Sequence, residues 1–165
     1  MLSTNMVVKV GIAQMDVVKT PNTIRTSGLG SCVGVVLYDE TKKIAGLVHI
    51  MLPDSSLGKT STLNAAKFAD TGIEALIEKL KMEGAQQYRL KAKIAGGAQM
   101  FQFTTDNDTM RIGPRNVEAV KNELKKYGIP IVAENTGGNS GRTIEFNPET
   151  SLLNIRTVNA GVCDI

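Results

Sequence analysis

The sequence CVGVVLYDETKKIAGLVHIML, residues 32–52, contains two apolar runs separated by a short polar segment. The runs cover residues 33–38 and 44–52, and the polar segment between them covers residues 39–42. Short apolar runs rich in valine and isoleucine favour strands, and polar residues of this kind favour turns. The stretch therefore predicts a β-hairpin.

This hairpin brings a cysteine, Cys32, near the only histidine in the chain, His49. With a two- or four-residue loop centred between Glu40 and Thr41, Cys32 lies directly opposite His49. Directly opposed residues share a face, with Cβ atoms about 4.5–5.5 Å apart, which suits contact between a thiol and an imidazole. A three- or five-residue loop shifts the register by one and places the two side chains on opposite faces. The predicted pairing is therefore conditional on the loop.

A thiol beside an imidazole points to nucleophilic chemistry. A free thiol has a pKa of about 8.5, so only about 3% is thiolate at pH 7, and the imidazole can accept its proton. The glycine-containing turn before the cysteine can bend sharply, and its N–H groups, at Gly30 and Ser31, could stabilise an oxyanion. Thr26, on a neighbouring extended segment, is a candidate to orient the second imidazole nitrogen. Packing roles for the cysteine and the histidine remain open alternatives.

Composition limits the other possible functions. The chain has 165 residues, of which 42% are apolar and 21% charged. This length and composition predict one globular domain that covers residues 1–165. The formal charge of +3 is spread along the chain and predicts no nucleic-acid partner. The two cysteines and one histidine lack zinc-site spacing, so no metal is expected. Cys163 is interpreted as a small apolar side chain or an idle thiol in a fraying end. The absence of a leader-like segment and of long apolar runs favours the cytoplasm without membrane insertion.

The remaining periodicity predicts many strands and two long helices. Further strands are expected at residues 7–13, 16–18, 23–26, 90–94, 131–133, 142–146 and 152–158. Helices are expected at residues 66–83 and 114–127, with Gly84 and Gly128 as caps and Pro114 at the first helical position. This order indicates an α+β fold rather than regular βαβ winding.

Several separate motifs resemble those of one family. The segments at residues 26–32 and 49–53, TSGLGSC and HIMLP, resemble the CheD family, the chemoreceptor glutamine deamidases. The resemblance continues through KFAD, GGAQMF, IGPRN and TGGNSGR at residues 67–70, 96–101, 112–116 and 136–142. Motifs in the same order along most of the chain are far more specific than any one of them.

The resemblance implies a layered α/β sandwich with mixed β-sheets and two long helices, similar to bacterial deamidating toxins. It implies a cysteine hydrolase, a protein-glutamine glutaminase without a cofactor. Cys32 would be its nucleophile, His49 its base and Thr26 the residue that orients the imidazole. The implied substrates are glutamine side chains on the cytoplasmic helices of methyl-accepting chemoreceptors, which become glutamate with release of ammonia and so tune chemotaxis adaptation. The enzyme would be cytoplasmic and recruited to membrane-bound receptors.

A binding role is the alternative function. Some members of the family bind a CheC-type phosphatase of the response regulator and raise its activity, so the chain could be mainly a regulatory docking module.

Each of three further motifs has two possible interpretations. The glycine pairs at residues 96–97 and 137–138 line a substrate groove or form tight turns. Arg115 and Asn116 contact a partner or form hydrogen bonds at the start of a helix.

Overall fold

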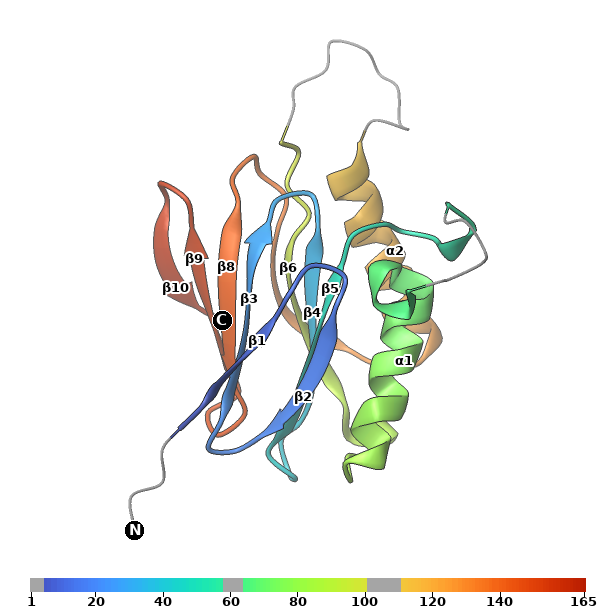
Figure 1. The fold of residues 1–165 in the computed structure, drawn as a ribbon, viewed down its shortest axis with the longest axis vertical. Coiled ribbons are helices and arrows are strands. Elements are labelled where there is room, and N and C mark those ends of the chain that lie inside the picture. The colour runs from blue at the N-terminus through green and yellow to red at the C-terminus, as the bar shows by residue number, and fades with distance from the viewer. Residues whose placement is uncertain (1–4, 58–63, 101–110) are drawn as a thin grey trace.

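The fold has three layers: two five-stranded sheets packed face to face, and two long helices on the outer face of one sheet (Figure 1). This computed structural model describes residues 5–57, 64–100 and 111–165. Each sheet contains both parallel and antiparallel pairs. The expected α+β class, with mixed sheets and two long helices, is confirmed.

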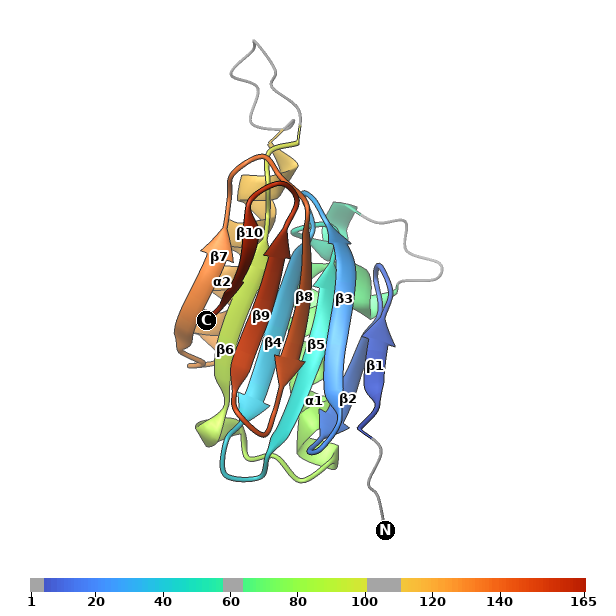
Figure 2. The same ribbon diagram turned by 90° about the vertical axis from the view of Figure 1, so that its left-hand side faces the viewer.

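The first sheet faces the viewer in Figure 2, in front of the second. Its strand order is β1-β3-β8-β9-β10, and only β1 and β3 run parallel. The strands are β1 (Val7–Val10), β3 (Thr23–Leu29), β8 (Arg142–Asn147), β9 (Leu152–Thr157) and β10 (Gly161–Asp164).

The second sheet is covered on both faces. Its strand order is β2-β5-β4-β6-β7, with β6 and β7 parallel. The strands are β2 (Met15–Lys19), β4 (Val33–Asp39), β5 (Ile44–Ile50), β6 (Lys91–Gly96) and β7 (Ile131–Thr136). Every residue of β4 and β5 is buried, because these central strands lie between the first sheet and the helices.

Helix α1 (Ala69–Met82) and helix α2 (Ile112–Lys126) cover the second sheet. The first begins three residues later than expected, because residues 65–67 form a separate 3-10 turn that Asn64 caps. The second begins at Ile112, so Pro114 is its third residue rather than its first. It still lies in the first turn, where no intrahelical partner for an N–H exists. Short 3-10 turns also occupy residues 55–57 and 87–89.

The register of β4 and β5 corrects one prediction. Gly34, not Cys32, lies opposite His49. The loop has four residues, 40–43, one of the two expected lengths, but it is centred one position later, which moves the pairing by two. Because the shift is even, the expected shared face is preserved.

Strand β10 was not predicted. Cys163, expected in a fraying end, pairs with Ile155 of β9 although its side chain is exposed. The strand has four exposed residues, so no alternation of apolar and polar positions marks it in the sequence. Positive φ angles at Asn159 and Gly161 make the tight turn that returns the chain to β9.

Candidate active site

Thr26 and His49 meet in the layer between the two sheets. Thr26, on β3 of the first sheet, is 2% exposed, and His49, on β5 of the second, is fully buried. The Thr26 hydroxyl lies 2.8 Å from His49 Nδ1. The structure therefore brings together two of the three predicted catalytic residues, through a hydrogen bond that joins the sheets.

A second contact of Thr26 fixes the tautomer of the imidazole. Thr26 Oγ1 lies 2.7 Å from the carbonyl oxygen of Val10, the residue beside it on β1. A carbonyl can only accept, so the hydroxyl donates its single hydrogen to Val10. The hydroxyl oxygen must then accept from His49, which places the proton on Nδ1 and leaves a lone pair on Nε2. This is the form of histidine that a general base requires.

Burial keeps the imidazole neutral. Desolvation lowers the pKa of His49 from 6.5 to about 4, since the charged form loses its contact with water. The partner is a hydroxyl rather than a carboxylate, so no negative charge at Thr26 opposes this effect. Within the described part of the chain, His49 Nε2 has no hydrogen-bond partner. The nitrogen that would act as base therefore carries no proton and makes no hydrogen bond to the described residues.

The backbone around His49 holds it in place. His49 N donates to Gln14 O at 3.0 Å, and His49 O accepts from Ala13 N at 3.2 Å. Across the sheet, a Cβ on Gly34 would lie 2.7 Å from Ile144 Cδ1, so a larger residue there would collide with the first sheet. The absence of a side chain at Gly34 lets the sheets approach closely beside the imidazole.

Cys32 lies at the end of the β3–β4 loop, partly exposed, and packs against the layer between the sheets. Burial of its sulfur raises the thiol pKa, and its own backbone N–H lowers it by less. The resting sulfur is therefore protonated at neutral pH. Among the described residues its thiol makes no hydrogen bond to His49. The structure thus places Cys32 on the imidazole's side of the sheet, without a direct bond to the base.

Two hydrogen bonds from the end of β6 hold the Cys32 loop. Gly97 N donates to Cys32 O and Ala98 N donates to Gly30 O, both at 2.8 Å. Any Cβ on Gly96 would collide with Cys32 O, and its φ of +113° also favours glycine. The glycine pair at residues 96–97 therefore serves as a turn that approaches the predicted nucleophile closely.

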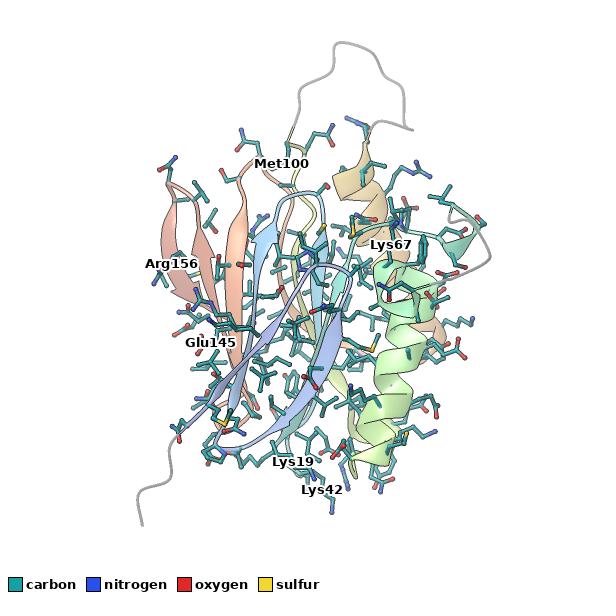
Figure 3. The ribbon with its side chains drawn as sticks, in the orientation of Figure 1. Lys19, Lys42, Lys67, Met100, Glu145 and Arg156 are labelled. Carbon is teal, nitrogen blue, oxygen red and sulfur yellow. The ribbon has the colours of Figure 1, made fainter. Side chains whose placement is uncertain are left out.

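Met100 lies over the same loop. A Cβ on Gly30 would come within 3.2 Å of Met100 Cγ, so the two residues face each other across a short gap. Figure 3 shows Met100 at the end of the molecule where the β3–β4 loop turns. Gly30, one of the two predicted oxyanion residues, thus lies beneath the exposed side chain of Met100.

Sequence reasoning missed one contributor to this site and named another, Asn116, without placing it here. The Val10 carbonyl, which fixes the tautomer, carries no side-chain signal. Asn116 lies near the start of α2 but donates to loops around the site rather than within its own helix. Among residues 5–57, 64–100 and 111–165, no three His, Cys, Asp or Glu side chains gather closely enough to hold a metal. None of the helices in these ranges has the length and apolarity to cross a membrane.

Comparisons with known proteins give the family. A family model described as CheD chemotactic sensory transduction matches residues 51–157. The chain is 63% identical over 161 residues to the chemoreceptor glutamine deamidase CheD of Halalkalibacterium halodurans, covering 98% of this chain and 99% of that one. It is 58% identical over 155 residues to the protein of that name from Bacillus subtilis strain 168, covering 94% and 93%.

A solved structure, that of YfiH from Bacillus licheniformis, aligns with a TM-score of 0.47 and 15% identity, over 76% of this chain and 51% of that one. The family assignment depends on the sequence matches. The family model begins at residue 51, whereas the matches to the two relatives extend over nearly the whole chain and include the region of Thr26, Cys32 and His49. This chain belongs to the CheD family.

Proposed function

We propose that this chain is a chemoreceptor glutamine deamidase, which hydrolyses selected glutamine side chains on chemoreceptor helices to glutamate and ammonia. Relatives at 58% and 63% identity, matched over nearly their whole length, carry that name. The observation that carries the mechanism is the chain of hydrogen bonds from His49 through Thr26 to Val10, because it leaves a lone pair on Nε2.

The reaction begins with proton transfer from the Cys32 thiol to His49 Nε2. The sulfur attacks the carbonyl carbon of the glutamine side chain, and an oxyanion forms. The C–N bond then breaks as His49 gives its proton to the leaving nitrogen, so ammonia departs and a thioester remains. Water, deprotonated by His49, attacks the thioester. The C–S bond breaks, the sulfur recovers its proton, and glutamate is released.

The resting electrostatics support a neutral pair. Burial raises the pKa of the Cys32 thiol and lowers that of the imidazole, so the proton rests on sulfur before attack. Thr26 orients the ring without stabilising a permanent imidazolium. Of the two predicted oxyanion residues, Gly30 already donates its N–H to Gly28 O at 3.1 Å. The candidate donors to the oxyanion are therefore the backbone N–H groups of Ser31 and of Cys32 itself.

The direct test uses purified protein and a chemoreceptor cytoplasmic fragment. Ammonia release is measured, and peptide mass spectrometry locates each new glutamate. We expect rapid conversion by the wild type and only a slow residual conversion by a folded Cys32→Ala variant. Cys163→Ala is the matched control, because that thiol is exposed on β10 and should be dispensable. Full activity in Cys32→Ala would exclude the thioester route.

We also propose two roles that the family resemblance implies, recruitment to membrane-bound receptors and docking to a CheC-type phosphatase. Docking to the phosphatase does not depend on deamidation if the phosphatase binds the surface of the folded chain rather than the Cys32 thiol. The Cys32→Ala variant should then stimulate the phosphatase as the wild type does. Loss of stimulation in that variant, with its fold intact, would contradict separable docking.

A further inference from the structure

Asn116 is fully buried near the start of α2, yet its side chain bonds outside the helix. Its Nδ2 donates to Ser31 O at 3.0 Å and to Met51 O at 2.9 Å. An amide nitrogen carries two hydrogens, so each carbonyl receives one of them. The donor capacity of Asn116 is therefore completely used on these two loops.

The two carbonyls belong to the segments that carry the proposed nucleophile and base. Ser31 immediately precedes Cys32, and Met51 follows His49 by two residues. One planar amide group thus sets the separation between the Cys32 loop and the end of β5. This matters because no hydrogen bond joins Cys32 to His49 directly within the described residues.

Anchoring the Ser31 carbonyl also aims the following N–H. In a planar trans peptide, the C=O of one residue and the N–H of the next point in opposite directions. Asn116 draws the Ser31 carbonyl toward α2, so the Cys32 N–H points away from the helix. Within the described part of the chain, neither this N–H nor that of Ser31 donates to a backbone carbonyl. The Cys32 N–H also lies near its own sulfur, whose pKa it lowers. Both N–H groups can therefore turn to an oxyanion formed by attack of that sulfur.

We infer that Asn116 is a positioning residue: it aims the Cys32 N–H at the oxyanion and fixes the Cys32 loop relative to the strand that carries His49. This inference rests on the proposed function. The other side-chain atom of Asn116 agrees with it. Oδ1 is buried without a partner among the described residues, so the two donor contacts alone orient the amide. An apolar side chain would avoid the unpaired oxygen but would leave Ser31 O and Met51 O without this donor.

The test compares three variants. Asn116→Ala removes both donors, and Asn116→Leu removes them while filling a similar volume. Val120→Ala is the matched control, because Val120 is equally buried one turn further along α2 but packs in the aliphatic core. Thermal unfolding gives the folded fraction, and kcat and KM for a receptor fragment are measured per folded molecule.

We expect kcat to fall about 10- to 100-fold in Asn116→Leu, with KM changed less than about threefold. That kcat loss lies below the effect of removing an oxyanion donor entirely. Val120→Ala should lose stability and keep its kcat. Wild-type kcat in a folded Asn116→Leu, an effect confined to KM, or an equal fall in Val120→Ala would overturn the inference. An inactive wild type would instead contradict the proposed function, so the two failures are distinguishable.

Discussion

The two faces of β4 and β5 share one backbone but differ in chemistry. Toward the helices the strands present aliphatic side chains, including Val35, Leu37 and Ile50. Toward the first sheet the alternate positions include Gly34 and His49. One face excludes polar groups, whereas the other accommodates a buried imidazole.

The difference shows how a stable sheet can hold a reactive group. Burying a polar group costs free energy unless it is hydrogen-bonded, so His49 needs a partner from the opposite sheet. Thr26 provides that partner, and only Nε2 stays unpaired. We expect the helix face to control mainly stability and the inter-sheet face to control both stability and catalysis.

The largest expected effect is at His49. His49→Gln keeps a neutral, hydrogen-bonding side chain but removes the base, so kcat should fall about 10²- to 10⁴-fold, the usual contribution of general acid–base catalysis. Steady-state assays on a receptor fragment measure this. A near wild-type kcat in the folded variant would remove the imidazole from the mechanism.

Core truncations separate the two faces. Leu76→Ala, on the helix side, should lower the free energy of unfolding by about 2–5 kcal/mol without changing kcat per folded molecule. Ile144→Ala should cost stability and also lower kcat, because Ile144 packs against Gly34 and pairs with Thr26 across the sheet. Denaturant unfolding and kinetics on both variants test this. A lower kcat per folded Leu76→Ala molecule would contradict the division between the faces.

The buried imidazole should also make stability depend on pH. Unfolded His49 binds a proton below about pH 6.5, whereas the folded pKa is about 4. Between these values the unfolded state binds more protons, so stability falls as pH decreases, by about 3 kcal/mol in total. Chemical denaturation from pH 7 to pH 4 measures the loss. His49→Gln should lack this component, and identical pH curves for the two proteins would count against a neutral buried imidazole.

A smaller effect is expected at the residue that orients the ring. Thr26→Val keeps the shape but leaves His49 Nδ1–H and Val10 O unpaired, so stability should fall by about 1–3 kcal/mol. The kcat should fall as well, since the tautomer is no longer fixed. Thr23→Val is the control, because it removes a hydroxyl from the same strand that bonds only Glu145 among the described residues. Equal kcat in the two variants would refute the orienting role.

The sequence allowed the fold class, both helices and most strands to be predicted, because β4, β5 and α1 carry strong apolar patterns. The register was wrong by two, since a polar loop of four residues does not fix its own centre. Strand β10 lacked any pattern. The Thr26–His49 contact joins residues from different sheets, so it was predicted from family resemblance and position, not from periodicity. Asn116 was ambiguous, because its partners are backbone carbonyls, which leave no trace in a sequence.

The central claim is that Cys32 and His49 act as one unit although no hydrogen bond joins them in this structure. A double-mutant cycle tests it most directly. The deamidation rates of Cys32→Ala, His49→Ala and the double variant are compared with the wild type, each corrected for its folded fraction. Groups that act as a unit give strongly non-additive losses. We predict that the double variant is no slower than the slower single variant. Losses that multiply would show that the two groups act independently and would contradict the account.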